Sequence, residues 1–291
     1  MQLPDNLDEQ VALCLREDLG AGDLSAALIA ADAVAEARVI AREAAVICGI
    51  AWFDAVFRQL DARVETAWSV ADGDGVCPEQ ILCELRGPTR ALLSGERTAL
   101  NLLQTLSGTA SAARDYVQAL RGTRTRLLDT RKTIPGLRAA QKYAVHRGGG
   151  QNHRMGLFDG VLIKENHILA AGSVSAALAH ARRLYPEAPP LEIEVETTAQ
   201  LEEAIQAGAD IVLLDNFTMA GLRAAVSTNR GRVPLEASGG FDLATLRHVA
   251  ETGVDYVSIG ALTKHLRAID LSFRIVSAGP GGRPLGARAF P

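Results

Sequence analysis

The stretch LEIEVETTAQLEEAIQAGADIVLLD, residues 191–215, decides the fold. It begins and ends with short apolar runs, 191–195 and 211–215. Residues 198–207 lie between them and follow a helical pattern that Gly208 closes as a C-terminal cap. A strand, a helix and a second strand in this order form the βα unit that is typical of a parallel sheet.

Units of this kind repeat along the second part of the chain. Strand-like runs begin at residues 191, 211, 235 and 256, so successive starts are 20, 24 and 21 residues apart. Each interval is long enough for one strand and one crossover helix. Earlier runs at 126–129 and 161–164 have the same character, and Asp242 can cap a helix over 243–251. The pattern predicts an α/β fold with a parallel, barrel-like sheet.

The amino-terminal part has a different pattern. Residues 35–47 and 62–85 alternate as strands do, and the turn cluster 72–75 interrupts the second segment. This predicts an α+β domain. A long helix is expected from Ser94 and joins the two regions, because its apolar residues are spaced by three or four positions. That stripe comprises Leu100, Leu103, Leu106, Ala110, Ala113, Val117 and Leu120.

Composition narrows the class of protein. The 291 residues include 48% hydrophobic and 22% charged residues, which is typical of a soluble globular protein and excludes a disordered or collagen-like chain. The net charge of -4 provides no general basic field for nucleic acid or an anionic membrane. No signal peptide or membrane-length apolar run is evident, so we expect a cytoplasmic protein. The cysteines lack Cys-x-x-Cys spacing and are interpreted as reduced packing residues; they are Cys14, Cys48, Cys77 and Cys83.

Positive charge is concentrated in residues 121–154. This segment has nine Lys or Arg residues against the single acid Asp129, a net charge of +8 in a chain of negative total charge. A solvated basic face is one explanation. Three neighbouring glycines at 148–150 suit close approach of a ligand, and Arg131 and Lys132 directly follow an expected strand. Arginine also offers a planar fork that matches carboxylate or phosphate. We therefore expect an anion site here.

Polar residues stand at the carboxyl ends of several expected strands. A buried parallel strand is normally almost continuously apolar, so a charge at its end is costly unless it faces an opening or a partner. Because barrels place their ligands at this end, the residues are expected to share one mouth. They are Lys164, Glu194, Asp215, Ser238 and Gly260.

Two glycine-containing loops suit a phosphate group. Ser238-Gly239-Gly240 and, one unit later, Gly260-Ala261 can direct backbone N–H groups at an anion, as barrels commonly do after their last strands. Together with the cations and two carboxylates, they predict a site for a polyanionic substrate and Mg²⁺. No Walker loop and no dinucleotide fingerprint occurs, which disfavours ATP and NAD as ligands.

Several longer motifs resemble the quinolinate phosphoribosyltransferase family. The resemblance covers most of residues 10–270 in order. Ile134 and Ser25 stand where the family usually has threonine, and neither change removes a charge. The motifs are REDLGAGDLS (16–25), SGERTALNLLQTLSGTAS (94–111), DTRKTIPGLR (129–138), QNHRMGLFDGVLIKENHI (151–168), EIEVE (192–196), LLDNF (213–217) and EASGG (236–240).

The resemblance implies an incomplete TIM-like α/β barrel with an amino-terminal α+β sandwich domain. We place the sandwich at 1–110 and the barrel at 111–270, and the tail 271–291 either packs back on the sandwich or is irregular. The implied reaction joins quinolinate to phosphoribosyl pyrophosphate and releases pyrophosphate and CO₂, giving nicotinate mononucleotide for NAD synthesis. The implied assembly is a homodimer, or a higher oligomer built from it, in which Arg97 completes the partner's site.

The resemblance also implies roles for individual residues. Arg131, His153, Arg154 and Lys164, with Arg97 from the partner, would hold the quinolinate carboxylates, and Lys132 and Lys164 would face pyrophosphate. Thr130 is a further expected substrate-binding residue. Glu194 and Asp215 would meet the ribose hydroxyls and Mg²⁺, and with the two lysines they form the expected catalytic set. The 5′-phosphate would lie against Ser238, Gly239, Gly240, Gly260 and Ala261.

Three alternatives use the same residues. A paralogue of the same fold could act on another aromatic acid. A Schiff-base lyase could use Lys164, because lysines on barrel strands perform that chemistry. The basic segment could instead form a nucleic-acid-binding module, whose affinity would depend strongly on salt.

Overall fold

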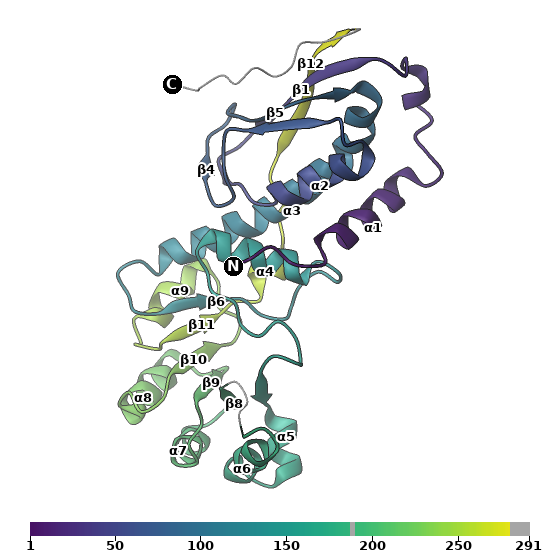
Figure 1. Cartoon of the computed structure of the whole chain (residues 1–291). Coiled ribbons are helices and arrows are strands. Elements are labelled where there is room, and N and C mark those ends of the chain that lie inside the picture. Colours follow the sequence, from purple (N-terminus) through teal and green to yellow (C-terminus); the bar gives the residue numbers. More distant parts are fainter. Residues whose placement is uncertain (187–189, 280–291) are drawn as a thin grey trace. The chain divides into compact units, whose positions relative to one another are not determined.

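A computed structural model describes residues 1–186 and 190–279 of the chain. Two compact units are present (Figure 1). Of the described residues, unit 1 contains 1–111, 139–148 and 266–279, and unit 2 contains 112–138, 149–186 and 190–265. The domain boundary at residue 110 stays a prediction; by their contacts, residues 139–148 group with unit 1.

Unit 1 is built on an antiparallel sheet with the strand order β12-β1-β5-β3. Strand β1, one of its two inner strands, alternates half-buried and buried residues, as expected for a sheet with one face against a core. The strands are β1 (Val34–Ala41), β3 (Glu65–Trp68), β5 (Ile81–Pro88) and β12 (Leu271–Gly279), with a separate pair β2 (Ala45–Val46) and β4 (Gly75–Val76).

The helices of unit 1 complete its core. Trp52, Phe53 and Phe57 of α2 are buried, and the ring of Phe53 lies edge-on to Trp68 of β3 at 5.1 Å. The α+β pattern of this part of the chain predicts helices but does not locate these ones, because its alternating segments dominate the pattern. The elements are α1 (Leu7–Leu19), the 3₁₀ turn η1 (Ala26–Leu28), α2 (Ile50–Leu60), α3 (Thr89–Ala119) and α4 (Arg138–Gly148).

For the long helix α3, the predicted apolar stripe is confirmed and the predicted start is wrong. It begins at Thr89, not Ser94, because the chain enters the helix directly after Pro88 ends β5. Leu103 and Leu106 are fully buried in the core of unit 1. Residues from 112 onward belong to unit 2, so this helix contributes to both units, as expected.

The carboxyl-terminal tail begins as a strand. Leu271–Gly279 forms β12, which pairs antiparallel with β1 from Ala41 to Val34. The irregular segment that we expected after Ala278 lies, from residue 280, outside the described residues. Among the cysteines, Cys48 and Cys83 are buried, whereas Cys77 is exposed, so the packing interpretation is wrong for Cys77.

Unit 2 is a parallel α/β sheet with the order β6-β11-β10-β9-β8-β7. It is an incomplete barrel, because β6 and β7 remain its edges and only an isolated bridge between Leu128 and Gln151 extends it past β6. The expected α/β class is thus confirmed. The strands are β6 (Arg126–Leu128), β7 (Val161–Ile163), β8 (Leu191–Val195), β9 (Ile211–Asp215), β10 (Leu235–Ser238) and β11 (Tyr256–Ser258).

Crossover helices lie on the outer side of this sheet (Figure 1). Local sequence explains several of their starts: the side chains of Ser173, Thr197, Thr218 and Asp242 each accept a backbone N–H in the first helical turn. The helices are α5 (Glu165–Ala171), α6 (Val174–Leu184), α7 (Thr198–Gln206), α8 (Met219–Asn229), α9 (Leu243–Ala250) and α10 (Ala261–Lys264). No helix of the described residues is both long and apolar enough to cross a membrane.

Candidate active site

The register of unit 2 turns alternate residues of each strand toward one side. Glu194 of β8 stands beside Leu213 of β9, which in turn stands beside Glu236 of β10. Ser238 lies one pleat further on and is the partner of Asp215. Because side chains alternate along a strand, these residues share one face of the sheet. That face is the interior of the incomplete barrel.

A cavity of about 300 Å³ opens at the carboxyl ends of these strands. Most of the strand-end and basic residues expected at the mouth line this single cavity. Sequence reasoning did not single out Leu162, Leu213, Glu236 and Ser258 of its wall. The lining residues are Thr130, Arg131, Lys132, His153, Arg154, Leu162, Lys164, Glu194, Leu213, Glu236, Ser238 and Ser258.

Two arginines in the cavity wall are close enough to affect each other. Burial, and next the charge of Arg131, lower the pKa of the Arg154 guanidinium. Nη1 of Arg154 donates to the carbonyl of Gly160 at 3.0 Å, which fixes the side chain. Nε of Arg131 is buried and has no hydrogen-bond partner among the described residues. A buried donor without a partner is costly, so this pair is prepared for an anion.

The loop that carries Arg131 and Lys132 is held from two sides. The backbone N–H of Lys132 donates to Oγ1 of Thr130 at 3.0 Å, and Oγ1 of Thr263 donates to the carbonyl of Lys132 at 2.8 Å. A Cβ atom at Gly260 would lie 2.9 Å from Cδ of Lys132. Glycine at this position therefore leaves room for the stem of Lys132.

Lys164 and Glu194 form an ion pair in the wall of the cavity. Burial, the largest cause, raises the pKa of Glu194, the ion pair with Lys164 lowers it, and the charge of Asp215 raises it. Asp215 does not line the cavity, but its influence on Glu194 places the two carboxylates near one another. Nδ2 of Asn216 donates to Oδ2 of Asp215 at 2.7 Å.

Of the two glycine-containing loops, the one after β10 adopts backbone conformations that favour glycine. Gly239 has φ of +129°, and a Cβ there would lie 2.7 Å from Oδ1 of Asn216. Gly240 also has a positive φ. The N-terminus of α9, by contrast, is capped by the carboxylate of Asp242, so the loop rather than that helix end is available to an anion. Gly260, next to Ala261, is the N-cap of α10 and carries no side-chain cap.

His153 is fixed differently from the expected substrate ligand. Its Nδ1 accepts the backbone N–H of Arg154 at 2.7 Å, and its Nε2 lies 2.9 Å from Oε2 of Glu192. The fully buried Asp129 accepts the backbone N–H of His153 and Nδ2 of Asn152. His153 thus lines the cavity with both ring nitrogens already engaged. Asp129, Asn152 and Glu192 were not recognised as site residues from the sequence.

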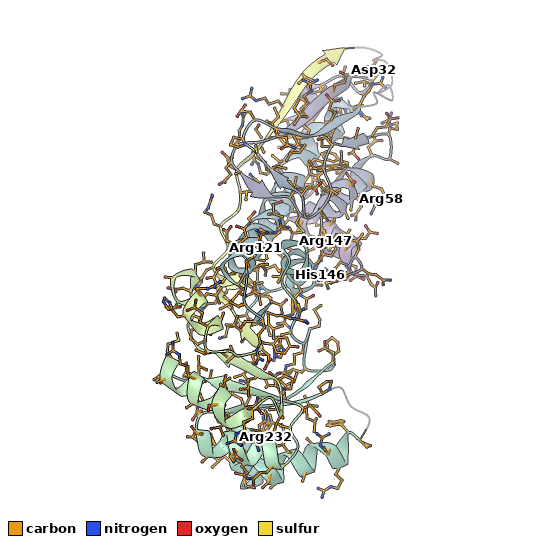
Figure 2. The ribbon with its side chains drawn as sticks, turned by 90° about the vertical axis from the view of Figure 1, so that its left-hand side faces the viewer. Asp32, Arg58, Arg121, His146, Arg147 and Arg232 are labelled. Carbon is orange, nitrogen blue, oxygen red and sulfur yellow. The ribbon has the colours of Figure 1, made fainter. Side chains whose placement is uncertain are left out.

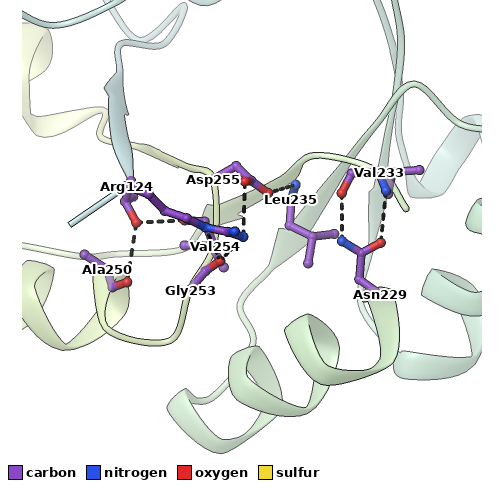
Figure 3. Close-up of polar contacts among 9 residues, drawn as sticks. Arg124, Asn229, Val233, Leu235, Ala250, Gly253, Val254 and Asp255 are labelled. Atoms are coloured by element: carbon purple, nitrogen blue, oxygen red, sulfur yellow. Dashed lines mark hydrogen bonds and ion pairs between the residues drawn. The ribbon is translucent and has the colours of Figure 1, made fainter. Parts of the chain in front are cut away.

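The basic segment 121–154 is not one surface. Only three of its nine cations, Arg131, Lys132 and Arg154, line the cavity. Arg124 is structural: its guanidinium donates to the carbonyl of Gly253 and pairs with Asp255 at 3.2 Å (Figure 3). Within this segment, the cations that line the cavity remain the candidates for the expected anion site.

The remaining cations of this segment are divided between the two units. Arg121 is an exposed residue of unit 2 that follows the end of α3, and Arg147 belongs to α4 in unit 1 (Figure 2). The guanidinium of Arg147 lies 4.9 Å from the ring centre of Tyr143. Arg97 is also a residue of unit 1. It is exposed, and its nearest acid is Glu96 at 3.7 Å.

The fold and the site together define an α/β-barrel protein with a cavity rich in cationic side chains at the carboxyl ends of its strands. Residues 109–274 match the description "Quinolinate phosphoribosyl transferase, C-terminal domain", and residues 23–107 match the N-terminal domain of the same family. The chain belongs to the quinolinate phosphoribosyltransferase family.

Individual relatives agree with this assignment. A probable nicotinate-nucleotide pyrophosphorylase [carboxylating] of Bacillus subtilis is 42% identical, over 89% of this chain and 90% of its own length. A quinolinate phosphoribosyltransferase [decarboxylating] of Nicotiana tabacum is 37% identical, over 91% of this chain and 81% of its own. The solved nicotinate-nucleotide pyrophosphorylase of Francisella tularensis is 44% identical with a TM-score of 0.90, covering 94% of this chain and 98% of that one.

Proposed function

We propose that this chain transfers the phosphoribosyl group of phosphoribosyl pyrophosphate to quinolinate, and that CO₂, pyrophosphate and nicotinate mononucleotide are the products. Its place is then in NAD synthesis, in the cytoplasm. The observation that carries the proposal is the adjacent pair Arg131 and Arg154, with an unpartnered donor nitrogen on Arg131, in a cavity that also holds Lys164 and Glu194. Two neighbouring carboxylates on a planar ring are the ligand that such a pair of guanidinium groups fits.

Quinolinate is assigned to the end of the cavity where the two arginines lie. Arg131 and Arg154 hold its carboxylates, with Lys164 and the Thr130 hydroxyl beside them. His153 contributes through its position in the wall, since both its ring nitrogens are engaged. The clamp orients the pyridine nitrogen toward the ribose carbon, and orientation of this kind lowers the barrier substantially.

The ribose and pyrophosphate are assigned to the other side of Lys164. The ribose carbon gains positive charge as its bond to pyrophosphate breaks, and the carboxylates of Glu194 and Asp215 stabilise that charge. Lys132 and Lys164 stabilise the negative charge on the leaving pyrophosphate. The backbone N–H groups of the loops after β10 and β11 receive the 5′-phosphate; these loops contain Ser238, Gly239, Gly240, Gly260 and Ala261.

Decarboxylation follows from the charge of the product ring. Once the ring nitrogen carries the ribose it is positively charged, and the C2–carboxylate bond breaks with its electron pair remaining on C2. The adjacent ring cation stabilises this carbanion, which then takes up a proton. The protein's contribution is to hold the ring in place through the arginine clamp.

The residues present fit Mg²⁺. Glu194 and Asp215 are neighbouring carboxylates at the mouth, and carboxylate oxygens together with phosphate oxygens are the ligands that Mg²⁺ prefers. When bound, the cation neutralises charge on the leaving pyrophosphate. We expect EDTA to abolish product formation and added Mg²⁺ to restore it, measured by release of pyrophosphate. Full turnover after complete metal removal would contradict this role.

We further propose a homodimer in which Arg97 completes the partner's site. Among the described residues, the exposed side chain of Arg97 has only a loose ion pair, with Glu96 at 3.7 Å. The proposal assigns the chain no nucleic acid or membrane partner.

Hybrid dimers test the shared site. Arg97→Ala and Lys164→Ala chains should each be nearly inactive alone. After mixing and subunit exchange, half the dimers are hybrids and one site in each is intact, so about a quarter of wild-type activity should return. No recovery, in a mixture shown to exchange subunits, would contradict the shared site.

The product assay discriminates the alternatives. The chain is incubated with Mg²⁺, phosphoribosyl pyrophosphate and one of several aromatic acids, and nicotinate mononucleotide is expected from quinolinate. Preference for another acid would instead identify a paralogue. A lyase needs an uncharged lysine amine, whereas Nζ of Lys164 is engaged by Glu194. Borohydride trapping of Lys164 with a carbonyl substrate would nevertheless support a lyase.

A further inference from the structure

Three titratable side chains meet where the cavity of the arginine pair adjoins a second cavity: His153 and Glu236 line both cavities, and Glu192 lines the second. They are His153, Glu192 of β8 and Glu236 of β10, and their ligand atoms all lie within 4.8 Å of one another. Nε2 of His153 is 2.9 Å from Glu192 and 3.7 Å from Glu236. The two glutamates are 6% and 1% exposed. The proposed reaction gives neither of them a role.

One of the two carboxyl groups in this cluster must stay protonated at neutral pH, in addition to the ring proton of His153. Nδ1 of His153 accepts a backbone N–H, so the ring proton is on Nε2, where it is directed at Glu192. Glu236 is deeper and further from the ring, and two carboxylates so close in a buried site cannot both ionise readily. Burial, followed by the charge of Glu192, raises the pKa of Glu236 to about 8. Glu236 is therefore the member that keeps the proton.

Glu236 lies between two cavities. It contributes to the floor of the mouth and also lines a second cavity of about 270 Å³ on the other side, together with Tyr256 and the start of β7 at Val161. Its Oε1 atom is buried and has no hydrogen-bond partner among the described residues. The proton can thus exchange with solvent from the far side, and one carboxyl oxygen is left for a ligand.

We propose that Glu236 is a specificity-determining residue, which holds a proton so that the floor beneath a dicarboxylate substrate offers an O–H donor and no second negative charge. This inference rests on the proposed function. A dicarboxylate brings two negative charges close to Glu192, and ionisation of Glu236 would add a third beside them. Repulsion of that kind acts strongly in a cavity shielded from water.

The charged surroundings of Glu236 must be included in any test. Deprotonation of the nearby lysines would also weaken anion binding at high pH, but an ordinary lysine titrates about two pH units above Glu236. The titratable and charged side chains on the neighbouring elements of the two cavities are Arg131, Lys132, His153, Arg154, Asp159, Lys164, Glu192, Glu194 and Tyr256.

The test compares the wild type with Glu236→Gln in the full chain. kcat/KM for quinolinate is measured from pH 6.5 to 9.5 at saturating phosphoribosyl pyrophosphate and Mg²⁺. In the wild type it should fall by about tenfold for each pH unit above the pKa of Glu236. In Glu236→Gln this loss should be absent up to the lysine range, because glutamine cannot ionise. Glu251→Gln is the matched control. Glu251 is exposed at the C-cap of α9, so this variant should keep the wild-type pH profile.

Infrared spectroscopy gives a second readout that needs no activity. The wild type at pH 7 should show the carbonyl stretch of a protonated carboxylic acid, which disappears as pH rises through about 8 and is missing in Glu236→Gln. An unchanged alkaline limb in Glu236→Gln, or no protonated acid in the wild type, would overturn the proposal. If no nicotinate mononucleotide forms at any pH, the proposed function itself fails, whereas the infrared result still decides the protonation of Glu236.

Discussion

Replacing Arg131 by lysine is expected to lower kcat/KM for quinolinate by about 100-fold, mainly through a higher KM. Nε of Arg131 is buried without a partner among the described residues, so a bound anion can supply the acceptor that this donor lacks. A lysine ammonium is a point charge and cannot reproduce the two parallel hydrogen bonds of a guanidinium. Loss of one or two charge-assisted hydrogen bonds, at about 1.5 to 3 kcal/mol each, accounts for the size of the effect.

The matched control for this variant is Arg126→Lys. Arg126 is exposed at the start of β6, the strand that leads to Arg131, and it does not line the cavity. Thermal unfolding of both variants should resemble that of the wild type. If Arg131→Lys binds quinolinate as the wild type does, Arg131 is not part of a carboxylate clamp.

Lys164→Ala is expected to reduce kcat by about 10²- to 10³-fold, the usual effect of removing a group that stabilises charge in the transition state. Lys164 lines the cavity and pairs with Glu194, and in the proposed reaction it faces both reactants. The ion pair lowers the pKa of Glu194 against the raising effect of burial, so removal of Lys164 raises that pKa further. A carboxylate with a raised pKa becomes protonated at a higher pH. The acid limb of the residual activity should therefore move to higher pH than in the wild type.

Lys264→Ala serves as the control, because Lys264 is exposed on α10 and outside the cavity wall. It should retain the wild-type rate and pH profile. An acid limb that stays in place in Lys164→Ala would show that Lys164 does not set the protonation of Glu194. A rate close to the wild type would remove Lys164 from the catalytic set.

The strands were predictable because their signal is local. β8, β9 and β10 have the expected bounds, since apolar runs between capped helices define a βα unit without reference to the rest of the chain. Strand-end polarity placed Lys164, Glu194 and Ser238 at one mouth for the same reason. The start of α3 was missed because a strand there passes into a helix without a loop.

The interior of the barrel was less predictable than its rim. Glu192 and Glu236 stand in the middle of apolar strands, where the desolvation argument applied to the strand ends holds equally well. Alternation along the strand would have pointed them toward the same face as Glu194 and Ser238. The basic segment 121–154 suggested more cavity residues than the structure shows. Closeness in sequence does not reveal that Arg124 holds the loop before β11. A role in a dimer, such as the one proposed for Arg97, leaves no local signal.

Carboxyl-labelled quinolinate provides the most direct measurement of the central claim, that the barrel mouth holds quinolinate and phosphoribosyl pyrophosphate together and joins them. The label is placed in the C2 carboxylate, and labelled CO₂, pyrophosphate and nicotinate mononucleotide are quantified in one reaction. The account predicts equal amounts of all three from quinolinate, and none when either reactant or Mg²⁺ is omitted. Nicotinate mononucleotide formed as readily from nicotinate, or pyrophosphate released without labelled CO₂, would contradict it.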